Sequence, residues 1–248
     1  MDCSKHDLVT FGCSFTYGHG LKDCLAEDGI GNGPKPSVLA WPNHLKSMCN
    51  FRTVDNQAEP GASNKIITKL IMDYKKFSRK SFVVIFWTNF DRQTVFYSKD
   101  YGDYLHMMPG FLKDRMPKKF FEYHGGGIKE NRPSPMKMRE MVETYYMDYH
   151  SDFDVYFDNI IRINYVNSWL KEKGIESRHV FMEHEWNRPA VFENKRYFNR
   201  FMMPDLKVKT FCYKKDFHID DALDRPKPHP GMSSHRFFAH NIKNWFKI

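Results

Sequence analysis

The segment at residues 81–87, which reads Ser-Phe-Val-Val-Ile-Phe-Trp, constrains the fold of this chain more than any other part of the sequence. Its apolar residues follow one another without interruption, whereas a strand with one face in water alternates apolar and polar residues. A strand of this kind needs apolar cover on both faces, and helices provide that cover in a parallel sheet. The segment therefore predicts a central strand of an α/β protein.

Strands and helices alternate along most of the remaining chain. Short apolar runs predict further strands at residues 7–12, 51–54 and 179–182. Apolar residues at helical spacing predict helices at residues 41–49, from Ser63 or Asn64 onward, at 152–173 and at 233–248. This alternation is typical of a parallel sheet with helices on both faces.

Length and composition favour one domain over residues 1–248. Hydrophobic residues make up 41% of the chain and aromatic residues 16%, which is enough apolar material for one large core. Residues 98–150 do not fit the alternation, because they are rich in Lys, Met, Tyr and Pro and show weak periodicity. We interpret this region as an insertion, either a lid or binding loop or a surface excursion with its own small helices.

Charge and cysteine content limit the partners and the compartment. The 38 Lys and Arg residues exceed the 30 Asp and Glu residues, but no run of five or more like charges appears, which disfavours nucleic acid as the main partner. The five cysteines include no CxxC pair, which favours free thiols in a reducing compartment. No signal region is visible, and no apolar run approaches the roughly 18 residues that span a membrane. We expect a cytoplasmic protein without a membrane partner; its oligomeric state stays open.

Residues suited to acyl transfer follow the predicted strands, where ligands of α/β sheets bind. Ser14 follows the first strand, Gly61 lies in a turn after the second, Asn89 follows the third, and His229 lies near the C-terminus. A serine hydroxyl is a weak nucleophile, so it needs a base such as an imidazole to take its proton. The N–H groups of Ser14 and Gly61 and the amide of Asn89 are candidates for the oxyanion hole. These four segments predict a serine-hydrolase site.

The same segments resemble the signature blocks of the SGNH (GDSL-like) hydrolases. Residues 12–18, Gly-Cys-Ser-Phe-Thr-Tyr-Gly, are similar to block I, with Cys13 where the family has aspartate, and residues 56–64 around Gly61 are similar to block II. Asn89 resembles the block III asparagine, and His229-Pro230 with the later Ser234-His235 resembles block V. The resemblance implies a three-layer α/β/α sandwich with a flavodoxin-like parallel sheet, and metal-free hydrolysis of esters, including acetyl esters. Gly-Cys-Ser-Phe-Thr also resembles a variant subgroup common in phage sequences, for which virion association or release by lysis is an alternative location.

Two departures from the family pattern concern the support of the site. Block III reads Trp87-Thr88-Asn89-Phe90 here, where the family has Gly-x-Asn-Asp. The acid that orients the histidine normally lies three residues before it, and that position is Pro226. Asp224 is our candidate for this acid. Asp220, Asp221 or a backbone carbonyl could replace it, and a dyad of serine and histidine is a further alternative.

Other side chains have competing interpretations. Tyr17, Trp87 and Arg92 are candidate substrate contacts, although aromatic residues more often pack in a core. Arg92 either binds an anionic group of the substrate or pairs with Asp91 or another nearby acid. Cys13 is an alternative nucleophile, but it lies one residue from the expected position. The segment Glu183-His184-Glu185 lacks the helical spacing of a zinc motif, so we expect no metal and no cofactor.

The sequence therefore predicts a serine esterase that acts on an acylated small molecule or glycan, with an acetyl-type acyl group. An O-acyltransferase could use the same site. The alternative from another class is a non-catalytic module that binds glycans or nucleic acid on a degenerate SGNH scaffold, because position 226 is not acidic, block III is altered and the net charge is +8.

Overall fold

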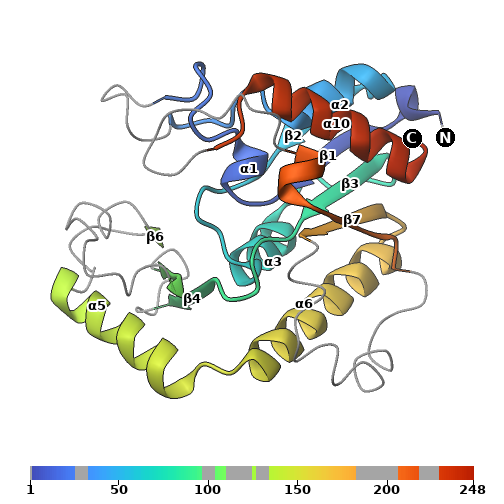
Figure 1. Cartoon of the computed structure of the whole chain (residues 1–248). Helices are drawn as coiled ribbons and strands as arrows, with labels where there is room; N and C mark the ends of the chain where they lie inside the picture. The colour runs from blue at the N-terminus through green and yellow to red at the C-terminus, as the bar shows by residue number, and fades with distance from the viewer. Residues whose placement is uncertain are drawn as a thin grey trace.

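The centre of the molecule is a parallel sheet of five strands in the order β2-β1-β3-β7-β8 (Figure 1). The computed structural model describes residues 2–25, 33–96, 104–109, 125–126, 134–182, 206–217 and 229–248. The strands are β1 (Asp7–Phe11), β2 (Thr53–Asn56), β3 (Ser81–Phe86), β7 (Glu176–Met182) and β8 (Val208–Phe211). Each neighbouring pair is parallel. The first strand lies between the second and third, which is the flavodoxin-like order, so the predicted sheet is confirmed.

Strand β3 occupies the middle of this sheet. It pairs with β1 on one side, where Asp7 lies opposite Ser81, and with β7 on the other, where Val180 lies opposite Phe86. All six of its residues are buried. The uninterrupted apolar run in the sequence therefore has the expected cause, which is cover on both faces of the strand.

Helices cover the two faces of the sheet. On one face α2 (Trp41–Cys49) packs against α10 (Met232–Phe246), and on the other α3 (Asn64–Asp73) packs against α6 (Asp152–Glu172), as Figure 1 shows. The predicted three-layer sandwich is confirmed, and every helix bound that the sequence predicted lies within two residues of the observed one. A short 3-10 helix at Cys3–Lys5 precedes β1. No helix among the described residues has the length and apolar character needed to cross a membrane.

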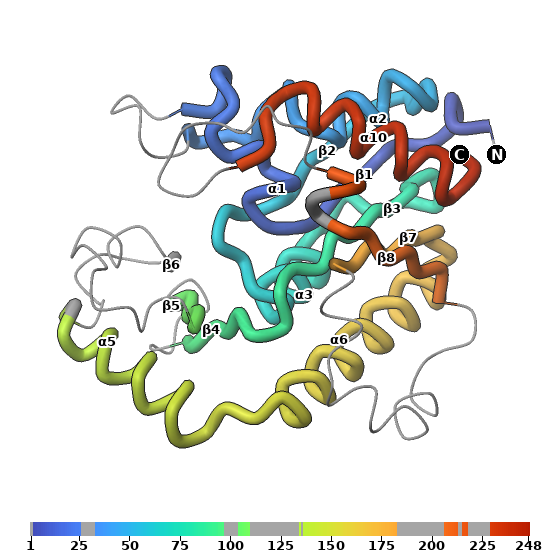
Figure 2. The backbone as a smooth tube through the Cα atoms, viewed as in Figure 1, coloured from blue at the N-terminus to red at the C-terminus, as the bar shows by residue number. Residues whose placement is uncertain are grey.

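A second, antiparallel sheet lies beside the first, in the order β4-β5-β6. Its strands are β4 (Gln93–Phe96), β5 (Tyr104–Met107) and β6 (Gly125–Gly126). Helix α5 (Pro135–Thr144) packs against it through a small core of Leu105, Met107, Met138 and Val142. The tube in Figure 2 runs from β3 into β4, and from α5 through a π-helical turn at Tyr145–Tyr149 into α6. The predicted insertion at residues 98–150 thus contains β5, β6 and α5, whereas the whole of β4 precedes it.

The structure differs from the sequence predictions at the edge strands β2 and β8 and at the start of β7. Strand β2 begins at Thr53, two residues later than expected, and β7 begins at Glu176, three residues earlier. Strand β8, which precedes a π-helical turn at Tyr213–Phe217, was not predicted. β2 and β8 each have one neighbouring strand, and most of their residues keep some solvent exposure. Edge strands need fewer apolar residues, so their sequence pattern is weak.

Candidate active site

Ser14 lies at the carboxyl end of β1, as the first residue of the short helix α1 (Ser14–Tyr17). The turn between β1 and α1 depends on Gly12. A Cβ atom at this position would lie 2.2 Å from Oγ1 of Thr16 and 3.2 Å from the Cβ atom of Phe86. Only glycine lets the first turn of α1 approach β3 this closely. Gly12 therefore fixes the position from which Ser14 faces its partners.

The side chain of His229 meets Ser14 across 215 positions of sequence. The distance from Nε2 of His229 to Oγ of Ser14 is 3.3 Å. This value is at the long end for a hydrogen bond, as is common in catalytic sites without substrate. His229 lies just before α10, and the ring of Phe15 packs edge-on against its imidazole with centroids 5.6 Å apart. The structure thus brings together the two residues that the sequence assigns to nucleophile and base.

His19 stacks on the ring of His229, with centroids 4.2 Å apart and an angle of 22° between the planes. Burial lowers the pKa of His19, so its ring is neutral at neutral pH. A neutral neighbour does not oppose positive charge on His229, whereas a protonated one would. No local pattern in the sequence signals the contact of His19 with His229.

The loop that carries Gly61 is fastened to the loop that carries Ser14. The side-chain amide of Asn56 donates to the carbonyl of Thr16 at 2.7 Å, and the N–H of Glu59 donates to the carbonyl of Gly12 at 3.1 Å. Gly61 has a φ of +83°, in the left-handed region that favours glycine. Ser63 then begins α3 as its N-cap, accepting from the N–H of Ile66. Block II is therefore held close to block I by its own backbone and amide groups.

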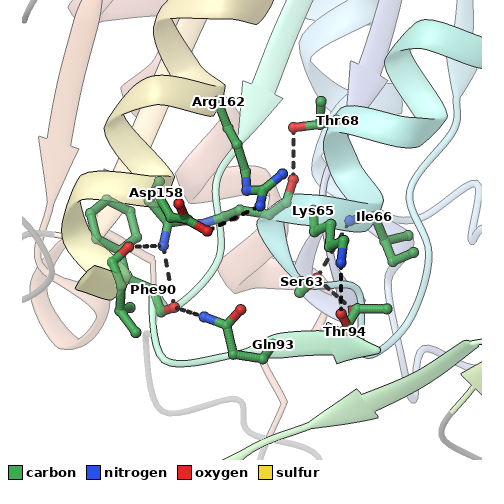
Figure 3. Close-up of polar contacts among 12 residues, drawn as sticks. Ser63, Lys65, Ile66, Thr68, Phe90, Gln93, Thr94, Asp158 and Arg162 are labelled. Carbon is green, nitrogen blue, oxygen red and sulfur yellow. Dashed lines mark hydrogen bonds and ion pairs between the residues drawn. The ribbon is translucent and has the colours of Figure 1, made fainter. Parts of the chain in front are cut away.

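Two buried asparagines hold the segment that contains Asn89. Oδ1 of Asn64 accepts the N–H of Thr88 at 2.8 Å, and its Nδ2 donates to Oδ1 of Asn159 at 2.6 Å. Asn159, from α6, donates in turn to the carbonyl of Phe90 at 3.3 Å. The backbone on either side of Asn89 is thus fixed from α3 and α6. Figure 3 shows the carbonyl of Phe90, which also accepts from Gln93.

A cavity of about 250 Å³ opens at Ser14. Among the described residues it is lined by Cys13, Ser14, Phe15, Thr88, Asn89, Arg92 and Met182. Three polar atoms of the lining residues, Oγ1 of Thr88, Oδ1 of Asn89 and Nε of Arg92, are buried without a hydrogen-bond partner among the described residues. Buried polar atoms are normally paired, so this arrangement favours a ligand with polar groups.

Two of the predicted substrate contacts are in the core. Trp87 is fully buried, and its Nε1 donates to Nδ1 of His179 at 3.0 Å. Tyr17 is buried too, and its hydroxyl donates to the carbonyl of Gly33 at 2.5 Å. Neither residue is among those that line the cavity. Arg92, the third predicted contact, does line it.

The acid that would orient His229 is not assigned by the structure. The candidates Asp220, Asp221 and Asp224 lie outside the described residues, as does the segment Glu183-His184-Glu185. Each therefore stays a prediction.

One group of three side chains among the described residues has the chemistry of a metal site. Asp91, His150 and Asp152 bring one ligand atom each to within 4.8 Å of the others. The close approach of the first two is a hydrogen bond, with Nε2 of His150 3.1 Å from Oδ1 of Asp91, and Asp152 is exposed. The pair joins the turn before β4 to the start of α6, which accounts for it without a metal.

A hydrogen-bond network of a hydroxyl, an imidazole and a carboxylate connects the antiparallel sheet to the Gly61 loop. Nδ1 of His106 lies 3.1 Å from Oγ1 of Thr94, and its Nε2 lies 3.3 Å from Oε1 of Glu59, which also accepts from the hydroxyl of Tyr104. Oγ1 of Thr94 lies 2.6 Å from Oγ of Ser63 (Figure 3). Burial lowers the pKa of His106, against the effect of Glu59. No pattern in the sequence predicts this network, because His106 lies in the segment with weak periodicity.

Sequence comparisons and structural comparisons give different results. No family model matches the sequence, and no curated protein matches it. Among solved structures, an acetyl xylan esterase (Est2A) from the rumen bacterium Butyrivibrio proteoclasticus matches 98% of this chain over 63% of its own, with a TM-score of 0.52 and 10% identity. A carbohydrate esterase, whose active site is described as having divergent catalytic and non-catalytic binding functions, has a TM-score of 0.50 and 11% identity. The match covers 98% of this chain and 68% of the esterase. A protein from Desulfitobacterium hafniense assigned to the G-D-S-L lipolytic family has a TM-score of 0.48 and 10% identity. The match covers 96% of this chain and 98% of that protein.

Identities this low carry information about the fold and not about the reaction. In this chain that fold is a central parallel sheet with helices on both faces. This chain therefore shares the α/β/α fold of these two esterases, which is the fold that its sequence motifs predict.

Proposed function

We propose that this protein is a serine esterase in which Ser14 is the nucleophile and His229 the general acid and base. The observation that carries the proposal is the 3.3 Å distance between Oγ of Ser14 and Nε2 of His229, at a cavity that Asn89 also lines. A hydroxyl and an amide that line one cavity, with an imidazole beside the hydroxyl, are the groups that acyl transfer requires. The candidate acid, Asp224, would orient the imidazole from its other side.

The reaction follows from the positions of these groups. His229 takes the proton of Ser14 as Oγ forms a bond to the ester carbonyl carbon. The N–H groups of Ser14 and Gly61 and the amide of Asn89 would hold the oxyanion, each donor contributing on the order of 3 kcal/mol. His229 then gives the proton to the departing alcohol. A water molecule attacks the acyl group in the same way and releases the acid and free Ser14.

A short acyl group suits the cavity. Its volume of about 250 Å³ is below the 300–1,000 Å³ typical of sites for drug-sized ligands, and Phe15 and Met182 supply apolar walls. We therefore propose an acetyl-type ester as substrate. Two of the similar folds belong to an acetyl xylan esterase and a carbohydrate esterase, which favours a carbohydrate as the alcohol. Transfer of the acyl group to a second sugar hydroxyl would use the same acyl-enzyme.

The direct test is turnover of 4-nitrophenyl acetate by the wild-type protein and by Ser14→Ala. We expect Ser14→Ala to lose at least 10³-fold in kcat, because no other group replaces the nucleophile. Labelling by a fluorophosphonate probe should be stoichiometric in the wild type and absent in Ser14→Ala. Cys13→Ala should still be labelled, which separates the two candidate nucleophiles. Full activity of Ser14→Ala would contradict the proposal, and glycan binding without any labelling would favour the non-catalytic alternative.

A further inference from the structure

Arg92 brings a positive charge to the cavity that also contains Ser14 and Asn89. It lies in the turn between β3 and β4, where its N–H donates to the carbonyl of Asn89 at 3.1 Å. One guanidinium nitrogen, NH1, donates to the carbonyl of Ala62 at 3.2 Å. The Nε atom is buried and has no hydrogen-bond partner among the described residues. The guanidinium is thus held at the cavity wall while part of its donor capacity is unused.

No carboxylate among the described residues neutralises this charge. The adjacent acid, Asp91, is turned to His150, with 3.1 Å between the carboxylate oxygen and Nε2. None of the ion pairs formed within the described parts of the chain includes Arg92. Burial is the main cause of the low pKa of His106, and the charge of Arg92 lowers that pKa further. A half-buried guanidinium without an acid costs free energy that an anionic ligand would offset.

We infer that Arg92 binds an anionic group of the substrate, so that the preferred esters carry a carboxylate, sulfate or phosphate near the bond that is cleaved. This inference rests on the proposed esterase function and names its substrate class. A guanidinium is suited to this task, because its planar set of N–H groups matches two oxygens of one anion. The anion belongs either to the acyl group, as in a half-ester of a dicarboxylic acid, or to the alcohol, as in an acidic sugar.

A purely structural role for Arg92 makes a different prediction. If its only task were to hold the carbonyl of Ala62, and with it the Gly61 loop, its loss would slow all esters by the same factor. A role in anion binding would slow charged esters selectively. The ratio of kcat/KM between charged and neutral esters therefore separates the two roles.

The first experiment measures that ratio for 4-nitrophenyl acetate, mono-4-nitrophenyl succinate and 3-carboxy-4-nitrophenyl acetate. The second substrate carries its charge on the acyl group and the third on the alcohol. We expect one charged ester to be preferred by the wild type, and the preference to fall at least tenfold in Arg92→Gln. Arg92→Lys should keep part of it. Equal losses on all three esters would overturn the inference.

Lys65→Gln is the matched control for the removal of a positive charge. Its Nζ donates to the carbonyl of Thr94 at 3.3 Å, close to the same loop, and Lys65 is not among the described residues that line the cavity (Figure 3). Glutamine keeps a donor and loses the charge. The preference for the charged ester should be unchanged in Lys65→Gln, and thermal unfolding of all variants checks that each is folded. If both variants lost the preference for the charged ester equally, the preference would come from the overall electrostatic field of the protein. That result would contradict a specific role of Arg92.

A second experiment measures anion binding without turnover. Ser14→Ala is titrated with succinate and with sulfate by calorimetry, beside Ser14→Ala/Arg92→Gln. Binding to the first protein that is at least tenfold weaker in the second supports the inference, even if the wild type hydrolyses no ester and the esterase proposal fails. Ester hydrolysis that depends on Ser14, with no charge preference and no binding that depends on Arg92, would overturn the inference and leave the esterase proposal standing.

Discussion

The pair Ser14–His229 and the pair Thr94–His106 contain the same chemical groups at nearly the same distance, 3.3 Å and 3.1 Å. The second pair even has a described carboxylate, Glu59, on the far nitrogen of its imidazole. Within the described residues, the second arrangement contains all three groups of a triad. The two pairs differ in their surroundings.

Access separates the two pairs. Thr94 and His106 are 3% and 1% exposed, and the hydroxyl of Thr94 is also bonded to Ser63. An ester carbonyl has no route to that hydroxyl, so the network holds the antiparallel sheet to the Gly61 loop. Ser14 lines a cavity, and its Oγ lies 3.3 Å from Nε2 of His229. A catalytic constellation therefore needs space beside its nucleophile as well as the correct groups.

The largest difference between the pairs should appear on removal of each imidazole. We expect His229→Ala to lower kcat for 4-nitrophenyl acetate by on the order of 10³-fold or more, because Ser14 then has no base. Its free energy of unfolding should change by less than about 1 kcal/mol, since the side chain is only partly buried. Steady-state kinetics and urea unfolding measure the two effects. A variant that is both stable and fully active would remove His229 from the proposed mechanism.

His106→Ala should show the opposite pattern. It removes one hydrogen-bond partner each from the buried hydroxyl of Thr94 and the carboxylate of Glu59 and opens a cavity, so we expect a loss of about 2–4 kcal/mol in the free energy of unfolding. Activity should fall by at most about tenfold, through a looser Gly61 loop. His106→Gln, which keeps a polar group, should recover part of the stability. A loss of activity as large as that of His229→Ala, without a loss of stability, would contradict this assignment.

The contrast between the two pairs also marks the limit of prediction from sequence. Central strands such as β3 could be predicted, because burial on both faces demands continuous apolar residues. Ser14, Asn89 and His229 could be proposed, because each follows a predicted strand or lies in a motif. The antiparallel sheet could not, since β6 is two glycines and pairs with β5 across a long excursion without periodicity.

Contacts between distant side chains were equally invisible in the sequence. Asn64 and Asn159 are 95 positions apart, yet their amide pair fixes the backbone around Asn89. His19 meets His229 only because α1 and α10 are brought together by the sheet. Such contacts depend on the complete fold, and no local pattern of residues signals them.

The smallest effect we expect is on the pH dependence of the free energy of unfolding. It arises from a buried imidazole, that of His179, which is not among the described residues that line the cavity. Complete burial, with the nearby charge of Arg178, lowers the pKa of His179 to about 3, while the unfolded chain has the ordinary value near 6.5. Between these values the unfolded state binds one more proton than the native state. The free energy of unfolding should therefore fall as the pH falls below 6.5, by up to about 1.4 kcal/mol per pH unit for this group.

Urea unfolding between pH 7.5 and 5 measures this slope, in a range where most carboxylates stay ionised. In His179→Asn the side-chain oxygen can still accept from Nε1 of Trp87, which donates to His179 in the native protein. We expect the slope of His179→Asn to be lower than that of the wild type by close to one proton. An identical slope in the wild type and His179→Asn would show that His179 takes up no more protons in the unfolded chain than in the native one, contrary to the low pKa that burial imposes.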